Sequence, residues 1–316
     1  MKSRQREAQV LGWDVGGTKS AAVTGTAGGR IVQRSQWASN AKAGPDAMIA
    51  DFLKRAKAML AKHPDVRAVG VSIGGPLDTG AGIVKSPPHL PGWDNVPLAE
   101  LLQKKLQLPV VVEHDAAACL LAEWLWGAAK GTTHAAYLTC GTGCGAGIMI
   151  DGRILRGPQG QSPEVGHVRL APDGPVMFGK AGSVESFCSG EGIGKLATHM
   201  FPERFARPAT TAELLKAARA GDRHARAVLA VSARRTGQLC ALLADIFCPR
   251  VIVLGSLARY FGRPWLAHIR REFRREALPV NSAATRIVPA KLAERLQDLS
   301  AIAPCVFREL RNSPAS

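Results

Sequence analysis

The chain has 316 residues, of which 46% are hydrophobic and 21% are charged, and this composition excludes a largely disordered or fibrous protein. Its 41 basic and 25 acidic residues give a net charge of +16, and its apolar stretches are shorter than the ~20 residues that a membrane span needs. The N-terminal segment lacks the apolar core of a secretory signal, and the seven cysteines form no C-x-x-C pair. We therefore expect a cytoplasmic protein without a disulfide framework.

The first part of the chain alternates short apolar segments with glycine-rich turns. Apolar periodicity and turn residues predict strands at 9–15, 20–25, 30–37, 66–73 and 110–112. They predict helices at 46–63, 97–106 and 116–126. Asp115 precedes the last of these helices and is the expected helix cap.

The same order of elements then returns. A strand is expected at 135–140, a second at 146–150 and a hairpin turn at Asp151-Gly152, and the segment 152–155 matches the segment 29–32. This pattern indicates an internal duplication at about 125 residues, although two unrelated β-meanders would give a similar pattern. A long helix at about 225–246, a strand at 251–254 and a last helix from about 292 follow.

This organisation predicts two lobes. The smaller N-terminal α/β lobe comprises residues 1–114, with the C-terminal helix of about 292–312 packing back on it, and the larger α/β lobe comprises residues 115–291. The densest basic group has helical spacing and comprises Arg270, Arg271, Arg274 and Arg275. It indicates a solvated helix face, with attraction of a polyanionic ligand such as a nucleotide as the alternative.

A glycine-rich turn follows the first strand. Gly16 and Gly17 allow backbone N–H groups to approach phosphate oxygens, while Thr18 adds a hydroxyl donor and Lys19 a positive charge. Asp14, at the strand end beside these phosphates, suits Mg²⁺. An ordinary hairpin with a buried aspartate is the alternative.

The equivalent turn in the second half is Gly141-Thr142-Gly143. A dinucleotide-binding fingerprint would need a helix directly after such glycines, and a strand is predicted there instead. Two phosphate turns, one in each half, therefore indicate a nucleotide site in a cleft. We interpret Cys144 beside this turn as a small structural residue rather than a redox-sensitive thiol.

Together these motifs resemble the ROK family, within the actin-like superfamily of sugar kinases and Hsp70 ATPases. The resemblance implies an α/β, two-lobed, actin-like (ribonuclease H-like) duplicated fold with a central cleft. It also implies a glucokinase-like enzyme that uses ATP and Mg²⁺ to phosphorylate a hexose on its 6-hydroxyl. The matching segments are 14–19, 74–76, 87–93, 113–116, 141–145, 164–167 and 251–255.

The resemblance also assigns roles to individual residues. Asp115 would be the general base, with simple helix capping as the alternative. Gly255 and Ser256 would line the adenosine side. Carboxylate and imidazole groups suit sugar hydroxyls. The alternative for a lone histidine is a core residue with its hydrogen bonds satisfied. The implied sugar-binding residues are Gly75, His89, His114, Asp115, Glu164, His167 and Glu185.

The chain departs from the family pattern in ways that affect the site. The family's zinc cysteines are absent from the segment 176–185, so we expect no zinc there and expect Ser183 or a backbone carbonyl to orient His167. His89 and His114 replace two family asparagines, which puts glucose specificity in doubt. The alternative is a catalytically silent or non-glucose ROK protein that binds a sugar or amino sugar such as an N-acetylhexosamine.

The sequence also disfavours other branches of the family and of the superfamily. The family's repressors carry a winged helix-turn-helix, and only about eight residues precede the first strand here, so we expect no nucleic-acid partner. Glu164, His167 and Glu185 argue against other actin-like ATPases. The expected partners are a sugar and ATP, with no membrane, and the resemblance implies a homodimer.

Overall fold

The computed structural model describes residues 7–312, which fold into two units. Within the described residues, unit 1 comprises 7–130, 155–162 and 292–312, and unit 2 comprises 131–154 and 163–291. This division differs from the boundary predicted at residue 114. Helix α3 (Asp115–Trp126) belongs to unit 1 because it packs against α11 (Leu296–Asn312), the C-terminal helix of the same unit.

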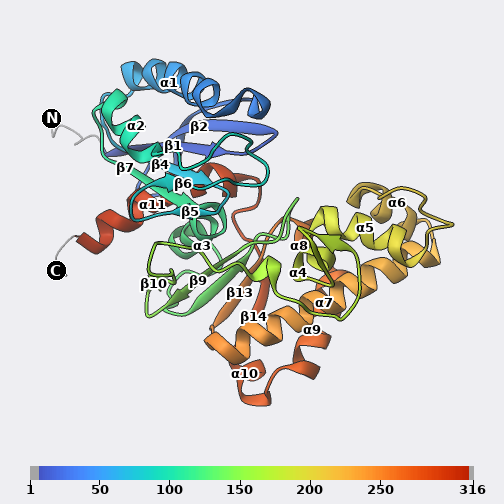
Figure 1. Ribbon diagram of the computed structural model, residues 1–316. Coiled ribbons are helices and arrows are strands. Elements are labelled where there is room, and N and C mark those ends of the chain that lie inside the picture. Colours follow the sequence, from blue (N-terminus) through green and yellow to red (C-terminus); the bar gives the residue numbers. More distant parts are fainter. Residues whose placement is uncertain (1–6, 313–316) are drawn as a thin grey trace. The chain divides into compact units, whose positions relative to one another are not determined.

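A five-stranded sheet forms the centre of unit 1 (Figure 1). Its strands lie in the order β3-β2-β1-β4-β7, with β1, β4 and β7 parallel and β2 antiparallel to both of its neighbours. Asp14 pairs with Ser72, and Ser72 pairs with Glu113, so the parallel strands end at one edge of the sheet. The strands are β1 (Gln9–Val15), β2 (Lys19–Thr26), β3 (Ile31–Ala38), β4 (Val66–Ile73) and β7 (Val110–His114).

Helices cover both faces of this sheet. On one face α1 (Gly44–Lys62) and α2 (Leu98–Leu106) bury an apolar cluster in which Trp13 stacks on Phe52 with ring centroids 4.3 Å apart. On the other face α11 packs against β1, β4 and α3. A Cβ atom on Gly70 would lie 2.2 Å from the Ala301 carbonyl oxygen, so glycine permits this close approach. Among residues 7–312, no helix is long and apolar enough to cross a membrane.

Unit 1 also contains the short segment 155–162, which lies between two parts of unit 2 in the sequence. The segment 155–162 lies beside the small hairpin of β5 (Leu77–Asp78) and β6 (Ile83–Val84), where the Thr79 hydroxyl donates to the Gly160 carbonyl at 3.2 Å. In the same segment, the Arg156 guanidinium binds the carboxylate of Glu113 at the end of β7. These contacts explain why the segment belongs to unit 1 although unit 2 precedes and follows it.

Unit 2 repeats the sheet of unit 1. Its strands lie in the order β10-β9-β8-β13-β14. Adjacent strands among the first three are antiparallel, and β13 and β14 run parallel to β8, which is the same pattern as in unit 1. The predicted internal duplication is therefore present in the topology. The strands are β8 (Ala135–Leu138), β9 (Ala146–Ile150), β10 (Arg153–Ile154), β13 (Val251–Leu254) and β14 (Arg286–Pro289).

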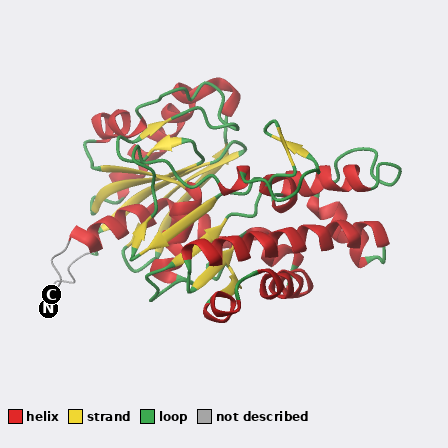
Figure 2. Cartoon of the chain, turned by 60° about the horizontal axis from the view of Figure 1, so that its bottom comes forward, coloured by secondary structure: helices red, strands yellow, loops and turns green. Residues whose placement is uncertain are grey.

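The helices of unit 2 are arranged around its longest one, α7 (Arg223–Phe247), which packs against α4, α5, α6 and α9. A small hairpin of β11 (Val176–Met177) and β12 (Lys180–Ala181) precedes α4. Strands and helices come in runs along the chain, such as β8 to β10 and α4 to α7, and Figure 2 distinguishes the two kinds of element by colour. The remaining helices are α4 (Val184–Cys188), α5 (Gly190–Met200), α6 (Thr211–Arg219), α8 (Ser256–Phe261), α9 (Arg263–Glu276) and α10 (Pro279–Ala284).

The arginine group at helical spacing lies on α9. Arg270 donates two hydrogen bonds to the Ile287 carbonyl, at 3.0 and 2.6 Å, and Arg275 pairs with Glu272 and Glu276. Two of the four guanidinium groups are therefore engaged within unit 2, which favours the interpretation as a solvated helix face.

Candidate functional site

The first glycine turn joins β1 to β2 in unit 1. Ser39, just after β3, holds this turn, because its N–H donates to the Thr18 carbonyl at 2.9 Å and its hydroxyl donates to the Gly16 carbonyl at 2.6 Å. Thr18 and Lys19 are exposed. Ser39 thus holds two carbonyl groups of the turn, while Thr18 and Lys19 are exposed to a ligand, which suits a phosphate-binding turn. Ser39 was not among the predicted site residues.

Asp14 is the penultimate residue of β1, so only Val15 separates it from this turn. The pKa of its carboxyl is raised to about 7, mainly by burial and in addition by the charges of Asp115 and Asp298, while the Arg34 guanidinium opposes the rise. Arg34 is itself held by two hydrogen bonds to Asp298, at 2.9 and 2.8 Å. The surroundings of Asp14 therefore carry an excess of negative charge that a cation would offset.

This arrangement fits Mg²⁺, the metal that the family resemblance implies. The ion prefers oxygen ligands and is commonly held by one or two carboxylates together with substrate phosphates and water. No group of three or more His, Cys, Asp or Glu side chains within residues 7–312 is placed to hold a metal alone. Asp14 is thus the protein residue that would hold Mg²⁺, with the phosphates of a bound nucleotide completing the site.

Asp115 follows the end of β7. The sequence predicts that this residue caps α3, but the prediction is wrong: Asp115 is the first helical residue, and His114 occupies the cap position without a side-chain cap hydrogen bond. The Asp115 side chain is 46% exposed, and its Oδ1 lies 3.5 Å from Nε2 of the buried His114. The carboxylate is therefore available to a ligand, and the imidazole is its neighbour.

Two predicted sugar-side residues lie close to these groups. A Cβ atom on Gly75 would be 2.9 Å from Cδ2 of His114, so the loop after β4 contacts the His114 ring. A Cβ atom on Gly17 would be 2.8 Å from the His89 carbonyl oxygen, so the loop that carries His89 lies against the first glycine turn. The predicted residues of unit 1 are thus brought together at one edge of its sheet.

Sequence patterns did not reveal the support behind Asp115. Glu113 is only 2% exposed, its Oε1 accepts a hydrogen bond from the His114 N–H at 3.0 Å, and its Oε2 binds Arg156. Burial raises the pKa of Glu113, while Arg156 opposes that rise. A carboxylate at the end of a buried strand indicates that a basic side chain lies nearby, but the sequence does not identify that side chain as Arg156.

The second glycine turn joins β8 to β9 in unit 2. The Gly190 N–H donates to the Gly141 carbonyl at 2.7 Å, so the start of α5 holds the turn. The Ser256 hydroxyl donates to the Cys140 carbonyl at 3.2 Å, and the Gly255 N–H donates to the Leu138 carbonyl at 2.8 Å. The residues predicted for the phosphate and the adenosine sides are therefore adjacent in unit 2.

Glu185 contacts the same turn. This residue, on α4, is 6% exposed, and its Oε2 accepts a hydrogen bond from the Cys144 N–H at 2.8 Å. A Cβ atom on Gly166 would lie 3.1 Å from the same Oε2. The Cys144 thiol is buried, and a hydrogen bond with Cys140 together with burial raises its pKa well above the ordinary value. A protonated, inaccessible thiol agrees with a structural role for Cys144.

Glu164 and His167 bracket the short 3₁₀ turn Val165–His167, and both are exposed. Of the two partners expected for the His167 ring, Ser183 is engaged elsewhere, since its hydroxyl bonds to Ser186 at 3.0 Å at the start of α4, and the alternative of a backbone carbonyl stays a prediction. The partner from this region is instead Lys180, whose Nζ donates to the His167 carbonyl oxygen at 2.8 Å.

The segment around His167 does not suit the zinc ion that the family pattern implies. A structural zinc site needs four ligands, usually including thiolates. Residues 176–185 contain no cysteine. The serines of this region bond to protein groups instead: the buried Ser186 hydroxyl donates to the Pro175 carbonyl at 2.7 Å, and Ser183 bonds to Ser186. No part of the function proposed below depends on zinc.

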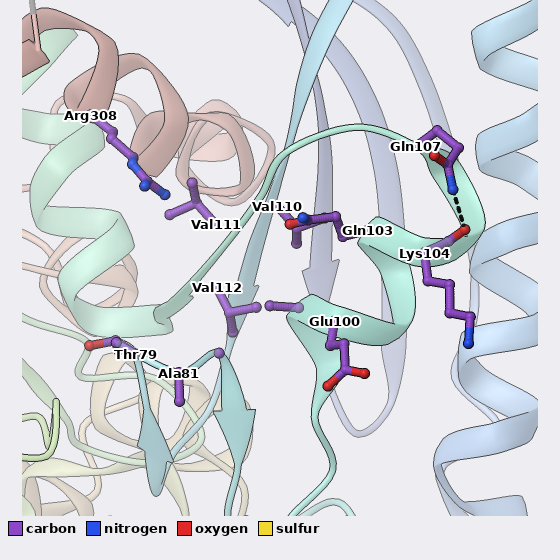
Figure 3. Close-up of a pocket in the computed structure, with 13 residues that line it drawn as sticks. Thr79, Ala81, Glu100, Gln103, Lys104, Gln107, Val110, Val111, Val112 and Arg308 are labelled. Atoms are coloured by element: carbon purple, nitrogen blue, oxygen red, sulfur yellow. Dashed lines mark hydrogen bonds between the residues drawn. The ribbon is translucent and has the colours of Figure 1, made fainter.

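A separate cavity of about 520 Å³ lies beside the edge strand β7 in unit 1 (Figure 3). Val110, Val111 and Val112 line it from β7, α2 contributes polar side chains such as Gln103, and Arg308 of α11 extends toward Val111. None of the residues predicted to bind sugar or nucleotide lines this cavity.

The ROK family model matches residues 10–297 of the chain. Among curated relatives, a glucokinase from Halalkalibacterium halodurans is 31% identical over 285 residues, which cover 85% of this chain and 86% of the relative. A xylose repressor from Caldicellulosiruptor bescii is 30% identical over 248 residues, covering 75% and 62%. An N-acetylmannosamine kinase from Escherichia coli is 32% identical over 251 residues, covering 78% and 83%.

Solved structures give the same assignment. A ROK hexokinase from Thermus thermophilus superposes with a TM-score of 0.83 at 31% identity, covering 96% of this chain and all (100%) of the other. A ROK family glucokinase from Streptomyces griseus, in complex with glucose and AMPPNP, superposes with a TM-score of 0.77 at 29% identity over 96% of this chain and 100% of the other. The fold is thus the two-domain, actin-like α/β fold, and the chain belongs to the ROK family.

Proposed function

We propose that the chain is a sugar kinase that transfers the γ-phosphoryl group of ATP to the 6-hydroxyl of a hexose. The observation that carries this proposal is that Asp14, the first glycine turn and Asp115 all lie where parallel strands of one sheet end. Phosphoryl transfer needs a positioned hydroxyl, a base, donors around the phosphates and a metal, and unit 1 carries candidates for each. The kinase relatives support the same reaction.

In this proposal Asp115 is the general base. It accepts the proton of the acceptor hydroxyl as the hydroxyl oxygen attacks the γ-phosphorus. Its exposed carboxylate is open to a ligand, and the ion pair of Glu113 with Arg156 supports the strand end from which it projects. Asp14 holds Mg²⁺, which neutralises charge on the nucleotide phosphates when bound.

Backbone donors bind the phosphates. We assign this role to Gly16, Gly17, Thr18 and Lys19 in unit 1 and to Gly141, Thr142 and Gly143 in unit 2. Gly255 and Ser256 receive the adenosine side. Ser39 and the start of α5 hold the two turns in place, which lowers the cost of ordering them when the nucleotide binds.

The remaining residues bind the sugar. Hydroxyl groups are recognised by paired carboxylate oxygens and by imidazole nitrogens, which both donate and accept. We assign the sugar to Gly75, His89 and His114 in unit 1 and to Glu164, His167 and Glu185 in unit 2. A cytoplasmic location, expected from the cysteine usage, and a homodimer, implied by the resemblance, form part of the proposal.

An amino sugar is the second candidate substrate. The N-acetylmannosamine kinase from E. coli is as similar to the chain as the glucokinases are, and His89 and His114 stand where the family pattern has asparagines. An imidazole offers a different set of donors and acceptors from an amide and so changes which substituents fit.

One experiment tests both candidates. ADP release is measured with ATP and Mg²⁺ over a panel of hexoses, hexosamines and N-acetylhexosamines, and product analysis locates the phosphate. We expect strong stimulation by one sugar or a few related sugars, with the phosphate on the 6-hydroxyl. If no sugar stimulates ADP release but one binds in calorimetry, the chain is a sugar-binding protein without catalysis. If none binds, the proposal is wrong.

A further inference from the structure

The hairpin formed by β11 and β12 projects beside the turn that carries His167. Its tip has unusual backbone conformations, with a φ of +46° at Phe178 and +75° at Gly179. Val176 and Phe178 on it are more than half exposed, at 58% and 54%. A short hairpin with so little buried apolar surface must be held by polar contacts at its base.

Such contacts attach the hairpin to the segment 167–171. The Leu170 N–H donates to the Gly182 carbonyl at 2.8 Å, and the Arg169 guanidinium donates to the Ala181 carbonyl at 2.7 Å. The Val184 N–H donates to the Val168 carbonyl at 2.8 Å. The base of the hairpin and the residues after His167 thus form one hydrogen-bonded layer in unit 2.

Lys180 adds the contact nearest to the candidate sugar site. Its ammonium reaches from β12 to the His167 carbonyl oxygen, and an ammonium donor makes this hydrogen bond stronger than a neutral one. In this turn Val165 and Gly166 are buried, whereas Glu164 and His167 are exposed, so Lys180 adds a contact on the exposed side of the turn.

We propose that Lys180 is a positioning residue for His167. By holding the His167 carbonyl, Lys180 fixes the peptide that follows the imidazole, and so limits the directions in which the ring can point. The hairpin thereby performs, with a single ammonium, the orienting role for which its segment has no metal ligands. The expected effect on sugar binding rests on the proposed function, whereas the contact between Lys180 and the His167 carbonyl does not.

The test compares three full-length variants. Lys180→Met keeps the aliphatic stem and removes the donor, whereas Lys180→Arg restores a cationic donor. Lys195→Met is the matched control, because Lys195 is a partly exposed lysine of unit 2 that pairs with Glu191 on α5, away from the hairpin. Each variant is examined by backbone hydrogen exchange of residues 164–170 and by steady-state kinetics with the sugar found in the panel.

We expect faster exchange of residues 164–170 in Lys180→Met, and a sugar KM raised roughly 3- to 10-fold, the loss expected for one charge-assisted hydrogen bond that acts indirectly. In Lys180→Met the KM for ATP and the melting temperature should stay near those of the wild type. Lys180→Arg should have nearly the exchange rates and the sugar KM of the wild type, and Lys195→Met should change neither.

Unchanged exchange in Lys180→Met, or an equal change in Lys195→Met, would overturn the inference. So would faster exchange with an unchanged sugar KM, since His167 would then not depend on the contact for binding. If the wild type phosphorylates no sugar, the proposed function fails separately, and the exchange of residues 164–170 still decides whether Lys180 holds the turn.

Discussion

The carboxylate of Glu185 accepts a hydrogen bond at 2.8 Å from the backbone N–H of Cys144, the residue that follows the second glycine turn. Glu185 is 6% exposed and also lies against Gly166, so it contacts both the candidate phosphate turn and the turn that carries His167. A side chain assigned to the sugar is therefore also a structural support for the assigned nucleotide site. Glu164, in contrast, is an exposed side chain.

This difference predicts different kinetics for two matched substitutions. Glu164→Gln should raise the sugar KM by roughly 10-fold or more, as expected for a lost hydrogen bond to a charged group, and should leave the KM for ATP nearly unchanged. Glu185→Gln should raise both KM values, because a neutral acceptor holds the Cys144 N–H less firmly than a carboxylate does. Steady-state kinetics with each substrate varied in turn measures this, and equal effects of the two substitutions on ATP would contradict it.

Asp115→Asn should lower kcat by at least ~10²-fold, the lower range for losing a general base. The amide is nearly isosteric, and its oxygen can still accept the hydrogen bond that the Ala116 N–H donates to Oδ1 of Asp115 at 2.6 Å, so the melting temperature should remain within a few degrees of the wild type. Sugar affinity, measured by calorimetry, should change little. A kcat near that of the wild type would remove Asp115 from the role of base.

Asp14 should make folding stability depend on pH when no metal is present. Its pKa is raised from 3.8 to about 7, so between these values the folded state binds a proton that the unfolded chain has released. The free energy of unfolding should therefore fall as the pH rises from about 4 to about 7, and this contribution should be absent above that range. Urea unfolding in EDTA at several pH values measures the slope.

The matched variant is Asp14→Asn, which cannot titrate and should show a flatter profile over the same pH range. Adding Mg²⁺ at pH 8 should raise the unfolding midpoint of the wild type more than that of the variant. Identical pH profiles for the two proteins would show that the carboxyl keeps its ordinary pKa in the folded chain.

Zinc content should be well under about one ion per chain in protein purified without a histidine tag, since the segment 176–185 offers no thiolate. EDTA should affect turnover only through Mg²⁺, and added Mg²⁺ should restore activity fully. Metal analysis by mass spectrometry, with and without prior dialysis against EDTA, provides the measurement. Stoichiometric zinc that survives dialysis would mean that His167 has ligands from outside its segment.

Local patterns in the sequence predicted most elements of the fold. The strands at 66–73, 146–150 and 251–254 have the predicted bounds, because continuous apolar runs between glycine or polar turns define a buried strand within a few residues. The repeated order of turns and strands predicted the duplication, which the equal order of the two sheets confirms. The resemblance to the ROK family rested on several motifs in one order along the chain, and the family model confirms it over residues 10–297.

Tertiary structure alone decided the relations between distant residues. The segment 155–162 belongs to unit 1 because Arg156 meets Glu113 and Gly160 meets Thr79, and nothing in the local sequence around 155–162 names these partners. The position of Asp115 as the first helical residue, rather than the cap, depends on where β7 ends, which a boundary prediction cannot fix to one residue.

The same holds for the orientation of His167. The sequence suggested Ser183 or a backbone carbonyl as its partner, but which side chains reach across a hairpin depends on the register and on the direction of each strand residue. That geometry brings Lys180 to the His167 carbonyl and turns Ser183 toward Ser186. The sequence thus determined which chemical groups the site has available, and packing over long separations decided which of them hold one another.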